Sequence, residues 1–447
     1  MNDNHNKTNL EDRALTAFQE CSSALVEAQL AVELRPRFRD AETAFSGDYD
    51  YLMDSSRFEE IVQLFFRVCV EHAVSFQVRR RAAFKHQIIL FGLDARKIVF
   101  EFWPHAELTT DSHRKGWSFL THRNFEKACE AGLKEETLAL LFICHLFFKK
   151  KDLSCSQVQW RLEDFVKRMS CIVEKGGRHA SFADGIRDLL SGIIQKQFTL
   201  AESNQMAISL LREKKIQLAG VGFAKRSRMF AKTRRFFRGG GARVIPCVGP
   251  DGSGKTYFIA AVMNSVEEHS LNVSSFRFKK LFRKNKIYSH INKRYRTQRN
   301  LPKNIADEKL ATFLYWVALP AYGWEVLKSL NKQAVFMDRF FLEFMVQGYR
   351  ENKGQDTKQI KGYSLLSRLI PRPRRMIVLT ANEELILSRK AELSSEAIQD
   401  FYTRYISYGV NQKISNIIFL NTHHSGPELA EYCLNATGIL KKIYRSS

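Results

Sequence analysis

The sequence lacks the cysteine patterns that mark secreted or metal-stapled proteins. Its eight cysteines are scattered along 447 residues and form no Cys-x-x-Cys pair. Neither a disulfide framework nor a cysteine-based metal site is therefore indicated. We expect reduced thiols that serve mainly in packing, as in cytoplasmic proteins.

Long apolar runs are also missing. The first eight residues are polar and lack the apolar core of a signal peptide. The longest apolar run, residues 137–148, is interrupted by His145 and is shorter than the ~20 residues needed to span a bilayer. We expect this run to form a buried helix of a soluble protein.

Acidic residues are in deficit. There are 47 Asp and Glu against 70 Lys and Arg, a formal net charge of +23. Such an excess favours anionic partners, namely nucleotides, nucleic acid, phosphorylated sugars or lipids, or a membrane face. Two acid-free segments, residues 225–238 and 277–299, concentrate the positive charge. Charge alone does not choose among these partners, and the oligomeric state stays open, a homodimer included.

Length and composition indicate two globular domains without repeats or low-complexity tracts. The hydrophobic content is 45% over 447 residues, enough for more than one core. We place a boundary at residues 223–242, where basic residues alternate with Phe and Met before three glycines. This linker either docks on a polyanion or anionic membrane face or, as we favour, packs its Phe residues on one domain. The predicted domains are residues 1–222 and 243–447.

The chain is organised around residues 249–256, Gly-Pro-Asp-Gly-Ser-Gly-Lys-Thr. This segment fits the phosphate-binding pattern of Gly, four residues, then Gly-Lys-Ser/Thr. An apolar strand-like segment precedes it and apolar residues at helical spacing follow, as the motif requires. Backbone N–H groups of such a loop face phosphate oxygens, and the helix start adds partial positive charge. The predicted nucleotide-binding residues are Gly249, Asp251, Gly252, Ser253, Gly254, Lys255 and Thr256.

Two of these side chains have specific roles in the prediction. Lys255 neutralises the β- and γ-phosphates of ATP, and the Thr256 hydroxyl ligates Mg²⁺. The remainder of the C-terminal half alternates strand and helix, which predicts a parallel α/β sheet between two helical layers. The predicted strands are 243–248, 272–278, 333–338, 374–380 and 415–420. The predicted helices are 255–268, 306–329, 339–350, 383–392, 395–409 and 427–440.

Further candidate residues follow later strands and helices of this half. Asp338 and Arg339 end an apolar strand, where side chains reach the crevice of an open α/β sheet. Asp338 would orient Mg²⁺-bound water or an acceptor hydroxyl, and Arg339 would clamp an acceptor phosphate; the alternative is a strand-terminal ion pair. Arg389 and Lys390 end a helix where a lid closes over ATP in nucleotide kinases, or form an ordinary solvated turn.

The N-terminal half carries carboxylates on two strand-like segments. Asp48 and Asp50 flank one residue at the start of an apolar stretch, and Glu101 lies within the apolar segment 97–103. Alternate strand residues face the same side, so these three acids are candidates to hold Mg²⁺ and a triphosphate. The alternative for Asp48 and Asp50 is local turn chemistry. We expect a first helix at 13–34 and a helical appendage over 123–215.

These residues carry resemblances to two families. The loop with its acid Asp251, Asp338-Arg339-Phe340 and the segment 389–394 resemble the thymidylate kinase-like P-loop family over residues 243–440. That resemblance implies a catalytic set of Lys255, Asp338, Arg339 and Arg389, with Asp251 facing the acceptor. The Asp-x-Asp segment and Glu101 resemble the nucleotidyltransferase superfamily over residues 13–170, implying an N-terminal α+β fold with a helical appendage. A Gly-Ser turn typical of that superfamily is absent before Asp48.

The predicted function is ATP- and Mg²⁺-dependent phosphoryl transfer to an anionic acceptor, either a nucleotide or a phosphorylated glycan or lipid intermediate. The acid-free segment 277–299 favours an acceptor bulkier than thymidylate. The alternative is a nucleotide-binding regulatory protein that attaches to nucleic acid or an anionic membrane surface, with or without an active N-terminal nucleotidyltransferase. We expect a cytoplasmic location, with membrane attachment through the basic segments as the variant.

Overall fold

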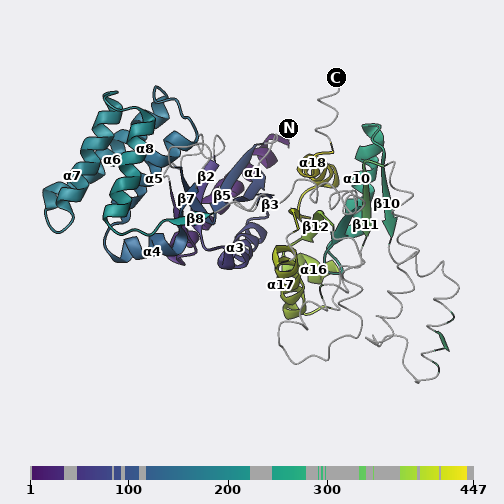
Figure 1. Ribbon diagram of the computed structural model, residues 1–447. Coiled ribbons are helices and arrows are strands. Elements are labelled where there is room, and N and C mark those ends of the chain that lie inside the picture. The colour runs from purple at the N-terminus through teal and green to yellow at the C-terminus, as the bar shows by residue number, and fades with distance from the viewer. Residues whose placement is uncertain are drawn as a thin grey trace, which may run out of the picture.

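The computed structural model describes most of the chain apart from the stretches that join its parts. Described are residues 3–34, 48–82, 85–91, 96–109, 117–221, 244–277, 332–338, 373–389, 393–411 and 414–439, with isolated positions between 290 and 346. These residues form a mixed α/β structure with one ten-stranded sheet and one three-stranded sheet (Figure 1). No helix within these ranges is both long and apolar enough to cross a bilayer.

In the N-terminal half of the large sheet, the helices α1 (Asp3–Glu27) and α3 (Phe58–Glu71) pack together in one core with the strands. The strands are β1 (Ala31–Glu33), β2 (Asp48–Met53), β3 (Phe76–Ala82), β4 (Lys85–Phe91) and β5 (Lys97–Trp103). The first helix was predicted over residues 13–34, but α1 begins ten residues earlier, at Asp3, and ends at Glu27, so both predicted ends were wrong. The chain turns through Gln29, whose φ is 50°, and Val32 then pairs with Leu52 of β2. The backbone groups of residues 31–33 are therefore satisfied by pairing with β2 and not within a helix.

A helical region follows, as the sequence predicted. Its elements are β6 (His105–Thr109), β7 (Trp117–Thr121), α4 (His122–Glu130), α5 (Lys134–Phe148), α6 (Ser156–Lys175), α7 (Ala180–Ile194), α8 (Leu200–Glu213) and β8 (Ala219–Val221). Helix α5 is buried on nearly all sides from Glu136 to Leu146, which confirms the buried helix expected from the apolar run. The other helices of the region pack around it in a core of their own.

The C-terminal half contains all five predicted strands, each within one residue of its predicted bounds. Its elements are β9 (Val244–Val248), α10 (Lys255–Glu268), β10 (Val273–Arg277), β11 (Ala334–Asp338), β12 (Arg375–Thr380), α16 (Glu383–Arg389), α17 (Ser395–Asn411), β13 (Asn416–Asn421) and α18 (Gly426–Thr437). The predicted helices at 306–329 and 339–350 lie outside the described residues, apart from Val346.

These five strands are parallel, in the order β10-β11-β9-β12-β13. Alternate residues of β9 enter different cores. Ile245 packs in the cluster that contains residues of α10 and α18, whereas Val244 packs in the cluster that contains residues of α17. Because successive strand residues point to opposite faces, helices cover both faces of this part of the sheet.

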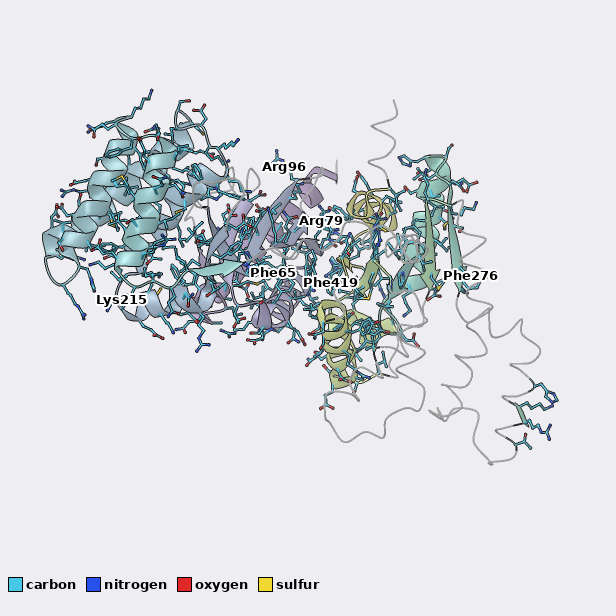
Figure 2. All side chains as sticks on the ribbon, in the orientation of Figure 1. Phe65, Arg79, Arg96, Lys215, Phe276 and Phe419 are labelled. Atoms are coloured by element: carbon cyan, nitrogen blue, oxygen red, sulfur yellow. The ribbon has the colours of Figure 1, made fainter. Side chains whose placement is uncertain are left out.

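One sheet runs through both halves, because β13 pairs antiparallel with β3. Its complete order is β1-β2-β5-β4-β3-β13-β12-β9-β11-β10. The hydroxyl of Ser75 accepts a hydrogen bond from the Asn421 backbone N–H at 3.0 Å, and α3 packs against α17. Phe65 and Phe419, labelled in Figure 2, are fully buried in one core shared by the two halves. The predicted linker at 223–242 lies outside the described residues.

Candidate functional site

The loop after β9 depends on glycine at defined positions. Val248 ends the strand, and α10 begins at Lys255. Gly252 and Gly254 have φ values of 92° and 82°, in the left-handed region that favours glycine. A Cβ at Gly249 would lie 2.4 Å from the Ser253 hydroxyl and 3.1 Å from the Leu379 carbonyl of β12. The glycines therefore let the loop coil tightly against the neighbouring strand.

Lys255 turns its side chain back over this loop. Its ammonium donates to the carbonyls of Gly249 and Pro250 at 2.7 and 2.8 Å and lies 3.5 Å from the Asp251 carboxylate. The side chain is only 9% exposed. A positive charge is thus held at the centre of the loop, next to the N-terminus of α10, whose first turn contains no acidic residue and whose dipole favours anions. Thr256, the next residue, is exposed.

Asp338 ends β11 beside the loop. It is in register with Cys247 of β9, two residues before Gly249. Its Oδ2 lies 3.8 Å from Nε of Arg277, and its Oδ1 is buried without a hydrogen-bond partner among the described residues. A carboxylate oxygen without a donor at this strand edge is a candidate ligand for bound water, a metal ion or an acceptor hydroxyl.

Arg389 reaches the loop from the end of α16. Its Nη1 lies 3.5 Å from the carbonyl of Gly252, and it is the nearest atom to a Cβ built at Gly254, at 3.7 Å. Thus Arg389 contacts the loop that contains Lys255, and Asp338 lies opposite Cys247, at the end of the strand that leads into the loop. Arg339 and Lys390 lie outside the described residues.

Two further residues lie at the carboxyl ends of the parallel strands and were not predicted as site residues. Arg277 ends β10 in register with Asp338, and Thr422, directly after β13, has a buried hydroxyl oxygen without a partner among the described residues. The signal for Arg277 was present, since it is a basic residue at the end of a predicted strand. No local signal singled out Thr422, whose importance comes from its position next to Gly254.

Two of the N-terminal carboxylates, Asp50 and Glu101, lie on adjacent strands, and each is bound by side chains of the protein. Asp50 of β2 and Glu101 of β5 are in register on adjacent parallel strands, which brings together two of the three acids that were predicted to act jointly. Asp50 accepts a hydrogen bond from Trp103 Nε1 at 2.9 Å. Glu101 accepts one from Gln87 Nε2 at 2.7 Å and forms an ion pair with Lys85. Asp48 is exposed at the strand start.

A metal site built from these acids stays a prediction. Within the described ranges, no group of three or more His, Cys, Asp or Glu side chains is placed to hold a metal ion. The basic segment 225–238 lies outside those ranges, as does most of 277–299. Polyanion binding by these segments therefore also stays a prediction.

Neither models of known protein families nor the curated proteins gave a match to this chain. Functional assignment consequently depends on the residues described above.

Proposed function

We propose that this protein binds ATP with Mg²⁺ at the loop 249–256 and transfers the γ-phosphoryl group to an anionic acceptor. One observation carries the proposal. Lys255, Asp338 and Arg389 come from different segments of the chain and lie at or near a single glycine-rich loop, at the carboxyl ends of parallel strands. Phosphoryl transfer requires an anchored triphosphate, a metal, a positioned acceptor and cations around the moving group, and this arrangement contains residues suited to each.

The donor side fits a triphosphate. Loop N–H groups and the start of α10 suit phosphate oxygens, and Lys255 and Arg389 bring positive charge to the same loop. The buried Ser253 hydroxyl oxygen has no partner among the described residues, so a ligand would satisfy a group that the protein leaves unpaired. Thr256 and Asp338 would hold Mg²⁺, which when bound neutralises charge on the phosphates.

The acceptor side fits an anionic molecule with a hydroxyl or phosphate nucleophile. Asp338 would orient that nucleophile, while Asp251 and Arg277 would hold the rest of the acceptor; both side chains are about half exposed. The acceptor oxygen attacks the γ-phosphorus, the bond to the β–γ bridging oxygen breaks, and ADP leaves. Resemblance of the loop and Asp338 to thymidylate kinase-like enzymes supports the same reaction class.

The test is ATP turnover with a panel of nucleoside monophosphates, sugar phosphates and polyprenyl phosphates. We expect Lys255→Ala to lower kcat/KM by about 100-fold or more, because it removes a charge that stabilises the transition state. Lys167→Ala, an exposed lysine on α6, is the matched control. Unchanged turnover in Lys255→Ala would contradict the proposal. Nucleotide binding without transfer to any acceptor would favour the regulatory alternative.

A further inference from the structure

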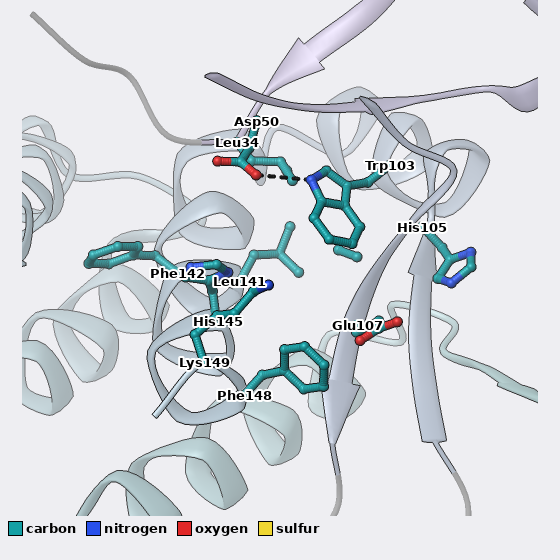
Figure 3. A pocket seen from close by; sticks show the side chains of 11 residues that line it. Leu34, Asp50, Trp103, His105, Glu107, Leu141, Phe142, His145, Phe148 and Lys149 are labelled. Carbon is teal, nitrogen blue, oxygen red and sulfur yellow. Dashed lines mark hydrogen bonds between the residues drawn. The ribbon is translucent and has the colours of Figure 1, made fainter. Parts of the chain in front are cut away.

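A pocket lies in the N-terminal half, between the strands β2, β5 and β6 and the helix α5 (Figure 3). Its apolar wall includes Trp103, Leu141 and Phe148, and its polar groups include Asp50, Glu107 and Lys149. Four strands separate β5 from β9, which at about 4.8 Å per strand places the two sites roughly 24 Å apart. The pocket is therefore distinct from the loop at 249–256.

Trp103 is held in a defined orientation at this pocket. Its indole N–H donates to Asp50, and the ammonium groups of Lys85 and Lys149 lie 4.8 and 5.5 Å from its ring centroid. These contacts fix the ring before any ligand arrives. A preorganised aromatic wall lowers the entropic cost of binding a ring compound.

Glu107 is the unusual polar group of the pocket. It lies on β6 and is half-buried. Burial raises the pKa of this carboxyl, and the nearby Lys149 opposes that effect. Figure 3 shows Lys149 on the helix side and Glu107 on the strand side of the pocket. A half-buried carboxylate in a pocket wall can accept a hydrogen bond from a ligand, and that bond then compensates for part of the desolvation.

The neighbouring acids, Asp50 and Glu101, have protein partners in place of a metal ion. Glu101 is 4% exposed, and the same oxygen receives both the Lys85 ammonium and the Gln87 amide. Lys85 thus supplies the positive charge that a divalent cation would otherwise bring to the acid pair. The metal-dependent triphosphate binding implied by the nucleotidyltransferase resemblance does not fit this arrangement.

We propose that this pocket binds a neutral, amino-substituted heteroaromatic ring of the nucleobase type, without a divalent metal ion. Glu107 accepts from the exocyclic amine, as carboxylates do from cytosine N4. Lys149 donates to the adjacent ring nitrogen or carbonyl, and Trp103, Leu141 and Phe148 contact the body of the ring. The inference is independent of phosphoryl transfer at the loop.

Two pairs of free nucleosides test this proposal, because the members of each pair differ mainly in whether the ring carries an exocyclic amine or a keto oxygen. Cytidine and uridine, and adenosine and inosine, are titrated calorimetrically into the full chain in EDTA. In at least one pair, we expect the amine-bearing member to bind about tenfold more tightly than its keto partner. Absence of binding, absence of amine preference in both pairs, or a requirement for Mg²⁺ would overturn the proposal.

A variant that changes ligand preference distinguishes a role of Glu107 in recognition from a role in folding. Glu107→Gln keeps the size of the side chain but adds an amide donor, so preference should shift toward the keto nucleosides. Misfolding would weaken both members of a pair together and would not exchange their order. Glu174→Gln, on the exposed surface of α6, is the matched control and should retain the wild-type order. A Glu107→Gln protein with the wild-type preference would contradict the assigned role.

Discussion

The ring of Phe76 on β3 lies face to face with the ring of Phe419 on β13, with centroids 4.4 Å apart and planes at 8°. This stack is part of the contact between the two halves of the chain, where β3 pairs with β13. Phe66 of α3 also packs on Tyr402 of α17, with the two ring centroids 4.8 Å apart. Both Phe76 and Phe419 are almost completely buried, so the two halves share one interior.

Phe419→Ala should therefore destabilise the whole protein. Truncating a buried phenylalanine costs about 3–5 kcal/mol, and we expect that loss in the free energy of unfolding measured with urea. Phe401→Ala, at a partly buried position of the same core, should cost less. Since the halves share a sheet, wild-type protein should unfold in one transition. Separate transitions for the two halves would contradict this continuity.

Gly249→Ala should abolish nucleotide binding while the fold is retained. A Cβ there would meet the Ser253 hydroxyl and the Leu379 carbonyl, forcing the loop away from β12. Gly185→Ala on α7 is the matched control, because a Cβ there has no atom within 4 Å and alanine gains up to about 1 kcal/mol within a helix. Binding of a fluorescent ATP analogue measures the effect on nucleotide binding, and thermal melting measures whether the fold is retained. Normal binding by Gly249→Ala would show that the loop tolerates displacement.

Lys85→Met should destabilise the N-terminal half by leaving the Glu101 carboxylate buried without its cation. Breaking such a pair on one side costs about 3–5 kcal/mol. Adding Glu101→Gln should recover most of that loss, because no buried charge then remains. The four proteins form a double-mutant cycle measured by urea unfolding at pH 7. Simple addition of the two single losses would mean that the ion pair is not coupled.

The stability of the protein should fall as pH drops below about 6.5, the ordinary pKa of histidine, partly through His424. Burial lowers the pKa of His424 in the folded protein, while Glu428 opposes that effect. The unfolded chain therefore takes up a proton before the folded protein does, and stability is lost as pH falls through this window. His424→Gln should flatten that part of the melting-temperature profile between pH 8 and 5. His423→Gln, at the exposed neighbouring position, is the control. A profile unchanged in His424→Gln would exclude this histidine as the cause.

Local patterns were sufficient for the strands and the loop of the C-terminal half. Helix α10 spans the residues predicted for it, because a glycine-rich turn and helical spacing of apolar residues depend on neighbours in the chain. The predicted end of the first helix was wrong because a distant strand overrides the local pattern there. Leu30 and Val32 match helical spacing, but pairing of β1 with the distant strand β2 decides their conformation.

By itself, the sequence determined the strands of the C-terminal half and the position of the glycine-rich loop, whereas the roles of Lys255, Asp338 and Arg389 stay predictions. Tertiary structure alone decided which residues meet across long separations. Gln77 donates to Asn416 across 339 positions, Lys85 pairs with Glu101, and Arg277 lies beside Asp338. Such contacts depend on how sheet edges and helices pack, which no local periodicity encodes. The continuous sheet and the Glu107 pocket therefore emerged only from the folded chain.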